Sequence, residues 1–371
     1  MRIAVVGPLE FPGRQGGMTR HIEEVYARLA GAGHDVTVLC RRAPAGPEYR
    51  GMHVRTVPAV PKSPFDRFTY SITASVRAAV GPFDVVHYHS YSNSGGCFLP
   101  ALTRRRVVMT VHRLEWLDEK WGRVGRTILR ANAWITHRVA RAFIAVSTDF
   151  AEYLRPRVPA SRVVVRIPNG ITLPDDIDDD APARFGYEAG EYLLAVSRLV
   201  PEKGLDVLCD ALDRLARDGH ALLPVAVAGR ARNPTEYSER LEARVERTPG
   251  PVRLLGVQPA PVVHGLYRAT RALVAPSRRE GNPLTVIEAM AHGVCVVASD
   301  IPPHRELLGD TGLLVPVGDA DALAGALAHV IDHPESARAL GDAARARIGT
   351  STEYQWDGVA ASTAEVLSAS G

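Results

Sequence analysis

Two glutamates separated by seven residues, Glu280 and Glu288, flank the start of a short, well-defined helix. Asn282 is a favourable N-cap, and Pro283 suits the first helical position because an N–H there has no intrahelical partner. Gly293 suits the residue just past a helix end, where the backbone turns left-handed. The sequence therefore predicts a helix that begins at Pro283 and ends before Gly293, with one carboxylate ahead of it and one inside it.

The chemistry that this arrangement offers is anion binding beside hydroxyl binding. The first N–H groups of the helix, at Leu284 and Thr285, point beyond the preceding strand, residues 272–275, and such a helix start favours a phosphate. The two carboxylates can accept hydrogen bonds from hydroxyls. The set suits a nucleotide sugar, and it fits equally well a capped helix with two surface glutamates.

Two basic residues, Arg198 and Lys203, lie in another loop that joins a strand to a helix. The loop, residues 197–204, follows an expected strand at 192–196. The carboxyl ends of parallel strands meet at one edge of a sheet, so both cations and the glutamate-flanked helix start could converge on one diphosphate. Taken alone, two basic residues in a surface loop are more often simply solvated.

The first half of the chain carries a histidine and two glycines at equivalent places. His112 follows an expected strand at 107–111, the position where ligands gather in open α/β sheets, although a lone histidine is more often structural. Gly16 and Gly17, in the loop that ends at Met18, allow a ligand to approach the backbone closely. This loop is not the Gly-x-Gly-x-x-Gly fingerprint, which argues against a nicotinamide cofactor.

These residues are positioned by strands and helices that alternate in both halves, the pattern of parallel sheets covered on both faces. In the first half we expect strands at 2–6, 35–39, 85–87, 107–111, 142–146 and 163–167, and a helix at 19–32. In the second half we expect strands at 192–196, 223–228, 252–255, 272–275, 295–298 and 313–315, and helices at 204–218, 235–247, 262–269, 283–292, 319–332, 335–348 and 354–367. We expect domains at 1–168 with the tail 355–371 and at 191–354, joined by a linker at 169–190. The Asp-x-Asp run at 176–180 is interpreted as solvated linker, not as a metal site.

Composition and charge limit the class of protein. The chain has 371 residues, of which 46% are hydrophobic and 23% charged, as in a soluble two-domain protein. It contains no apolar run long enough to span a membrane and no secretion signal, so we expect a cytoplasmic protein. Its four cysteines are far apart, which favours reduced core residues over a metal site. Residues 1–168 hold 25 Lys and Arg against 12 Asp and Glu, whereas the rest hold 19 against 29, a split that indicates different partners.

Two spacings carry a family resemblance. Glu280 and Glu288 with Ala-Met-Ala behind them, and Arg198 in Arg-x4-Lys-Gly spacing with Lys203, resemble the signatures of the retaining glycosyltransferases of family 4. The resemblance covers almost the whole chain and implies an α/β GT-B fold, in which two Rossmann-like parallel-sheet domains face a cleft. It implies a retaining transferase of the hexosyltransferase type that needs neither a metal ion nor a cofactor. Such an enzyme moves a sugar from a nucleoside diphosphate sugar to an acceptor hydroxyl, and a UDP-sugar is favoured over a GDP-sugar as the donor.

The resemblance also implies residue roles. Arg198 and Lys203 would bind the diphosphate, Glu280 and His112 the transferred sugar, and Glu288 the ribose. Further donor contacts are implied at Gly16, Gly17, Asn169, Gly229, Val257, Asn282, Pro283, Leu284 and Thr285, and acceptor contacts at Met18, Glu115 and Trp116. Where the family usually has Gly-aromatic-Gly-Leu after the first glutamate, this chain has Gly-Asn-Pro-Leu, which leaves fewer backbone N–H groups for the donor. The run 115–122 fits an acceptor wall and fits equally two tryptophans that cap the next helix.

The expected partners are a nucleotide sugar and an acceptor that is a small molecule or a lipid-linked glycan, without nucleic acid. The basic amphipathic segment 120–141 could lie on an anionic membrane, at the inner face, or attract an anionic acceptor. It could equally be an ordinary solvated face. Two other functions remain open for the whole chain, a nucleotide-sugar epimerase of the same architecture and a non-catalytic subunit that binds sugar nucleotides.

Overall fold

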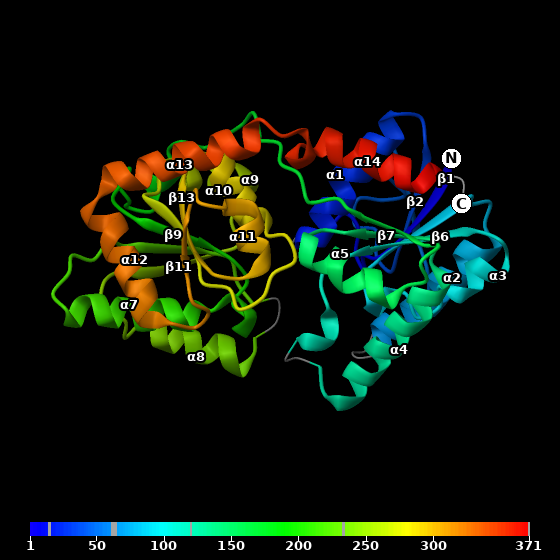
Figure 1. The fold of residues 1–371 in the computed structure, drawn as a ribbon, viewed down its shortest axis with the longest axis horizontal. Coiled ribbons are helices and arrows are strands. Elements are labelled where there is room, and N and C mark those ends of the chain that lie inside the picture. Colours follow the sequence, from blue (N-terminus) through cyan, green and yellow to red (C-terminus); the bar gives the residue numbers. More distant parts are fainter. Residues whose placement is uncertain (14–15, 61–64, 119–120, 232–233, 370–371) are drawn as a thin grey trace. The chain divides into compact units, whose positions relative to one another are not determined.

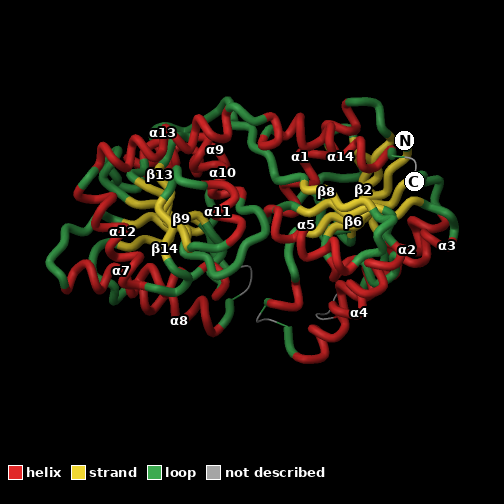
Figure 2. Tube along the Cα trace, viewed as in Figure 1, coloured by secondary structure: helices red, strands yellow, loops and turns green. Residues whose placement is uncertain are grey.

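The computed structural model describes residues 1–13, 16–60, 65–118, 121–231 and 234–369. The chain divides into two compact units. Unit 1 comprises Met1–Gly170 and Gln355–Gly371, and unit 2 comprises Ile171–Tyr354. In each unit, helices cover both faces of a single sheet (Figures 1 and 2).

The sheet of unit 1 has eight strands in the order β3-β4-β2-β1-β5-β6-β7-β8. All neighbours are parallel except β3 and β4, which form an antiparallel hairpin at one edge. The strands are β1 (Arg2–Val6), β2 (Asp35–Cys40), β3 (Glu48–Tyr49), β4 (Met52–Thr56), β5 (Val85–His89), β6 (Arg106–Val111), β7 (Ala142–Ala145) and β8 (Val163–Arg166). The carboxyl ends of β1, β5 and β6 therefore lie side by side at one edge of this sheet.

Helices α1 and α14 lie over one face of this sheet and α2 and α4 over the other (Figure 1). The helices of unit 1 are α1 (Gly17–Gly31), α2 (Phe65–Val80), α3 (Phe98–Leu102), α4 (Arg123–Val139), α5 (Thr148–Leu154) and α14 (Trp356–Ser368). The core under α2 and α4 is apolar, with Tyr70, Tyr88 and Phe143 fully buried. Helix α14 packs against α1, and Arg28 Nε donates to Asp357 Oδ1 at 2.5 Å.

The sheet of unit 2 has six parallel strands in the order β11-β10-β9-β12-β13-β14. They are β9 (Leu193–Val196), β10 (Val225–Ala228), β11 (Val252–Gly256), β12 (Ala272–Ala275), β13 (Cys295–Ser299) and β14 (Leu313–Val315). The helices are α6 (Ala181–Arg184), α7 (Leu205–Arg217), α8 (Glu236–Val245), α9 (Ala260–Ala269), α10 (Leu284–Ala291), α11 (Pro302–Leu308), α12 (Ala320–Asp332) and α13 (Pro334–Gly349). Separate apolar clusters fill the two faces, one under α7 and α12 and one under α9, α10 and α13.

The two parallel-sheet α/β units confirm the expected fold class. The sequence analysis missed the hairpin of β3 and β4, whose two turn residues, Arg50 and Gly51, both have positive φ, 47° and 78°. Two such residues form the turn type that joins twisted strands, but Arg-Gly is a weaker signal for it than Asn-Gly or Asp-Gly.

The stretch that we expected to be a solvated linker is partly ordered into unit 2. Helix α6 lies in it, and its first residue, Ala181, is fully buried. Asp178 forms an ion pair with Arg184, and a side chain at Gly265 in α9 would collide with the Asp178 carbonyl at 1.9 Å. The acidic run is therefore held in place by α9, because the short helix buries its apolar face there.

Candidate functional site

Helix α10 begins one residue later than its cap signals indicate. Its N-cap is Pro283, in extended conformation with ψ 111°, and the expected N-cap at Asn282 is wrong because the helix starts at Leu284. Val286 N donates to the Pro283 carbonyl at 3.1 Å. Leu284 and Thr285 thus occupy the first turn, whose N–H groups lack intrahelical acceptors. The expected end is confirmed, because Gly293 has a φ of 71° and donates to Met290 O.

Lys203 and Glu280 form the central ion pair of unit 2. Lys203 Nζ donates to Glu280 Oε1 at 2.6 Å, and the two side chains are 17% and 13% exposed. Ser277 Oγ donates to the same carboxylate oxygen at 2.7 Å. Burial raises the pKa of Glu280, but the Lys203 ammonium and the Ser277 hydroxyl outweigh it, so that the net pKa lies below the usual value. Glu280 is therefore a carboxylate, with a cation and a hydroxyl fixed beside it.

The loops that carry this pair are locked together by a second ion pair. Arg278 donates to both carboxylate oxygens of Asp206, at 3.0 and 2.6 Å, and its backbone N–H donates to Glu202 O at 2.8 Å. Gly204 lies so close to the next loop that a Cβ would be 2.0 Å from the Pro276 carbonyl, and its φ is 65°. A glycine is needed there for the Lys203 loop to reach the loop before α10.

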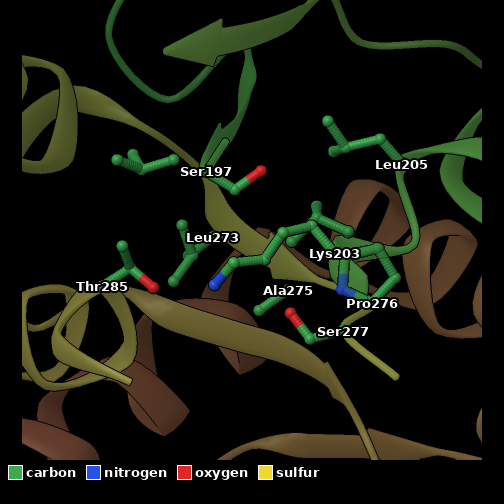
Figure 3. A pocket seen from close by; sticks show the side chains of 10 residues that line it. Ser197, Lys203, Leu205, Leu273, Ala275, Pro276, Ser277 and Thr285 are labelled. Carbon is green, nitrogen blue, oxygen red and sulfur yellow. The ribbon is translucent and has the colours of Figure 1, made fainter. Parts of the chain in front are cut away.

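A pocket lies where these loops meet the start of α10. Ser197, Lys203, Ser277 and Thr285 line it, together with apolar residues of β9 and β12. Figure 3 shows the Lys203 side chain reaching across this pocket, with hydroxyls of Ser197, Ser277 and Thr285 around it. Arg198 follows Ser197 directly but does not line the pocket. The structure thus brings together Lys203, Glu280 and the α10 start.

Glu288, in the middle of α10, is held by a buried tyrosine. Tyr267 is fully buried, and its hydroxyl donates to Thr285 O at 3.1 Å and to Glu288 Oε2 at 3.3 Å. The bond fixes the Glu288 carboxylate relative to the first turn of the helix. Sequence reasoning missed Tyr267, because it lies 21 residues away in α9.

His304 is a further residue that sequence reasoning missed. It lies fully buried in α11, and its Nδ1–H donates to the Ser299 carbonyl at 2.7 Å. Burial lowers the pKa of His304, although the nearby Glu280 opposes this. A neutral imidazole thus stands near the Lys203–Glu280 pair. No sequence signal marks it, because Pro-Pro-His-Arg reads only as the start of a helix.

The strand-end glycine Gly229 shapes the adjoining edge of the sheet. Its N–H donates to Gly256 O at 2.7 Å, and a Cβ on it would lie 1.9 Å from the Ser197 carbonyl. Val257 follows Gly256 and is 42% exposed. Gly229 therefore allows the loops after β9, β10 and β11 to approach one another at this edge of the sheet.

In unit 1, His112 belongs to a cluster of three histidines at the carboxyl ends of β5 and β6. Its Nε2 lies 2.9 Å from His89 Nδ1, and its ring lies edge to face with that of His21, 4.9 Å between centroids. His21 Nδ1 donates to Asn169 Oδ1 at 2.9 Å. A ring nitrogen of each histidine lies within 4.8 Å of the others, an arrangement that could also hold a metal ion. Burial lowers the pKa of His112 well below its usual value, and that of His21 to about 4.

The glycine loop leads into helix α1, which carries His21. Gly16 has a φ of 115° and precedes α1, and Gly17 is its first residue. Met18 Sδ accepts a hydrogen bond from Ser90 Oγ. Arg14 and Gln15 of the same loop lie outside the described residues.

Glu115 and Trp116, the expected acceptor residues of the run 115–122, are both buried within unit 1. Glu115 is buried, and its Oε2 accepts a hydrogen bond from Ser92 N at 2.8 Å. Trp116 is 7% exposed and packs against Tyr91, 5.3 Å between ring centroids. Both side chains therefore serve packing and loop anchoring within unit 1. Glu119 and Lys120 of the same run lie outside the described residues.

Known proteins match both units. Residues 15–173 match the family described as Glycosyltransferase Family 4, and residues 177–347 match the family described as Glycosyl transferases group 1. Phosphatidyl-myo-inositol mannosyltransferase of Mycobacterium leprae is 31% identical over 342 residues, which cover 88% of this chain and 86% of that protein. The chain belongs to the GT4-like glycosyltransferases.

This glycosyltransferase is also similar to glycogen synthase of Mycobacterium tuberculosis, with 28% identity over 99% of this chain and 94% of that protein. Among solved structures, sucrose-phosphate synthase from Thermosynechococcus elongatus superposes with a TM-score of 0.83 at 22% identity, covering 98% of each chain. Anabaena HepE in complex with UDP and glucose superposes with a TM-score of 0.81 at 20% identity, covering all of both chains. These structural likenesses establish the GT-B fold.

Within the described residues, no helix is long and apolar enough to cross a membrane.

Proposed function

We propose that this glycosyltransferase moves a hexose from a nucleoside diphosphate sugar to an acceptor hydroxyl, with a UDP-sugar favoured over a GDP-sugar as the donor. The reaction retains the configuration of the anomeric carbon and needs no metal ion. The observation that carries the proposal is the pocket in which Lys203, Glu280 and the first turn of α10 meet. A cation and helix N–H groups without intrahelical acceptors suit a diphosphate, and a fixed carboxylate suits sugar hydroxyls. The structures of Anabaena HepE in complex with UDP and with UDP-glucose support the donor class.

The proposed chemistry is stabilisation of the departing diphosphate. As the bond to the anomeric carbon breaks, negative charge grows on the phosphate, where Lys203 and Arg198 would neutralise it. The same phosphate would accept the acceptor's proton on the face it leaves, which gives retention. Glu280 would bind the sugar, Glu288 the ribose, and His112 the sugar hydroxyls. No residue of the chain is assigned as a covalent nucleophile.

The acceptor is proposed to be anionic or lipid-linked. Helix α4 exposes Val124, Ile128 and Trp134, which are 74%, 44% and 56% exposed, while its opposite face is buried. Arg138 lies over the Trp134 ring at 3.8 Å. Apolar and basic side chains on one helix face can rest on an anionic membrane surface, which we place at the cytoplasmic leaflet. The relative named as a phosphatidyl-myo-inositol mannosyltransferase supports this acceptor class.

The test is a donor screen followed by product analysis. Thermal unfolding is measured with UDP-, GDP- and ADP-sugars, since a donor held at 100 times its Kd stabilises by about 2.7 kcal/mol. The stabilising donor is then incubated with lipid and glycan acceptors in the presence of a chelator, and the anomeric configuration of the product is read by NMR. An α-linked product from an α-linked donor supports the proposal. Donor turnover without acceptor would instead point to an epimerase, and binding without any product to a non-catalytic subunit.

A further inference from the structure

A continuous chain of buried hydrogen bonds leads to His112 from the interior of unit 1. Thr110 Oγ1 lies 2.7 Å from His87 Nε2, and His87 Nδ1 lies 2.6 Å from the Tyr26 hydroxyl. The same hydroxyl lies 2.8 Å from His89 Nε2, and His89 Nδ1 lies 2.9 Å from His112 Nε2. The first four members of this chain are completely buried, whereas His112 is partly exposed.

The protons in this chain cannot be placed independently. Burial lowers the pKa of His87 to about 3 and that of His89 well below its usual value, so each ring is neutral and carries one N–H. Each link needs one donor and one acceptor, and the Tyr26 hydroxyl has a single proton. Three arrangements supply every link with one donor and one acceptor. In the first, all three rings carry the proton on Nδ1, and in the second, all three carry it on Nε2. In the third, His87 carries it on Nδ1 while His89 and His112 carry it on Nε2, and the Tyr26 oxygen accepts from both His87 and His89.

The two buried hydroxyl protons, of Thr110 and of Tyr26, decide among the three arrangements. With the ring protons on Nδ1, the Thr110 hydroxyl donates to His87 Nε2, and no buried N–H or O–H is left without an acceptor. With all three ring protons on Nε2, Thr110 must accept instead, and its own proton has no acceptor among the described residues. In the third arrangement the Tyr26 oxygen accepts twice, and its proton has no acceptor among those residues. A buried donor left without a partner shifts such an equilibrium roughly ten- to a hundredfold. The Nδ1–H arrangement is therefore the populated one.

We propose that Thr110, His87, Tyr26 and His89 are positioning residues that hold His112 in its Nδ1–H form, so that its open end donates a hydrogen bond to an oxygen of the bound sugar. The sugar as the partner of His112 rests on the proposed function. The neighbouring His21 complements this donor, because its Nδ1–H is taken by Asn169 Oδ1 and its Nε2 remains an acceptor. A hydroxyl both accepts and donates, so one sugar hydroxyl suits the pair.

A metal ion held by His21, His89 and His112 is the competing use of the same rings. Coordination through His89 Nδ1 would require the His89 proton on Nε2, which leaves a buried hydroxyl proton, that of Thr110 or that of Tyr26, without an acceptor. It would also break the His89–His112 bond. The hydrogen-bond chain and a metal site therefore make opposite predictions about the same nitrogens.

The experiment is ¹⁵N NMR of histidine side chains, which reports directly which ring nitrogen carries the proton and needs no substrate. In the wild-type protein we expect His87, His89 and His112 all to be protonated on Nδ1 at neutral pH. Protonation of His112 on Nε2 would overturn the proposal. A stoichiometric shift of the three rings on addition of Zn²⁺, with the loss of the His89–His112 bond, would overturn it in favour of a metal site.

Variants test the coupling along the chain. Tyr26→Phe removes the central hydroxyl, and we expect the His112 form to change from a single species to a mixture, with kcat reduced about tenfold. Tyr88→Phe is the matched control, because its hydroxyl is equally buried in β5 but donates to Ser75 Oγ at 2.8 Å, outside the chain. It should leave the His112 signals and kcat unchanged. Thr110→Val should weaken the preference for Nδ1–H, and Thr110→Ser should restore it.

These results separate the two proposals. If the histidines are protonated as expected but no sugar nucleotide is turned over, the proposed function fails while the hydrogen-bond chain stands. If turnover is present and His112 carries its proton on Nε2, the chain fails while the function stands. Equal mixing of the His112 forms in Tyr26→Phe and Tyr88→Phe would also contradict the chain.

Discussion

Replacing Lys203 by methionine should destabilise unit 2 through the carboxylate it leaves behind. Glu280 would keep only the Ser277 hydroxyl beside it, in a site where the carboxylate is 13% exposed. Breaking a fully buried pair costs about 3–5 kcal/mol, and the residual exposure of both side chains lowers this to about 2–3 kcal/mol. Without Lys203 the effect of burial on Glu280 dominates, so its pKa rises and the loss should be smaller at pH 5.5 than at pH 8.

The assay is urea unfolding of Lys203→Met, Glu280→Gln and the double variant at both pH values. The double variant has no stranded charge, so its stability should return to within about 1 kcal/mol of wild type. Turnover should not return, because Lys203 is also proposed to neutralise the leaving diphosphate, a role worth roughly 10²–10³-fold in kcat. A single variant that costs under about 0.5 kcal/mol, or a double variant no more stable than it, would refute the reasoning.

Four further predictions can be checked with purified protein. Arg198→Ala should lower kcat roughly 10²–10³-fold and weaken donor binding far less, and kcat within threefold of wild type would sink the assigned role. A chelator should leave activity unchanged, whereas loss of activity that Mg²⁺ restores would contradict metal independence. Anionic liposomes should bind the protein at low salt but not at high salt, because surface attraction is screened over about 10 Å at 0.1 M. Arg130→Glu on α4 should abolish this binding, whereas the control Arg338→Glu on α13 should not. Equal binding to neutral liposomes would argue against an electrostatic membrane contact. Stability should fall as pH drops below about 6.5, because His87 binds a proton only in the unfolded chain until near pH 3. That ring alone accounts for about 1.4 kcal/mol between pH 7.5 and 5.5, and a flat profile in urea unfolding would refute this.

The sequence predicted most strands and helices because their signals are local. Residues 272–275 and 313–315 were expected as strands and are observed as β12 and β14. The stop at Gly293 follows from conformational freedom that a single residue provides. The wrong cap at Asn282 shows the limit of such signals, because Pro283 keeps an extended ψ and itself becomes the cap.

The interactions that build the site were beyond local reasoning. Arg278 and Asp206 are 72 residues apart, and Tyr26 and His89 are 63 apart, so no spacing in the sequence indicates either contact. Burial is the second missing quantity, because Trp116 looks the same in sequence whether it forms a wall or lies in the core. The spacing of Lys203, Glu280 and Glu288 could be noticed only because a known family has it.

The return of the chain to unit 1 bears on how the protein is made. Unit 1 consists of residues 1–170 and 355–371. All of unit 2 must therefore be synthesised after the first segment of unit 1 and before α14 can dock on it. Its docking is specific, since a Cβ at Gly170 would lie 2.7 Å from Trp356 N and the Trp356 ring lies 5.8 Å from that of His21. Until then α1 has an uncovered apolar surface, and a nascent chain with such a surface is prone to aggregate. A circular permutant that starts at Gln355 would make unit 1 contiguous and should fold it during synthesis rather than after it.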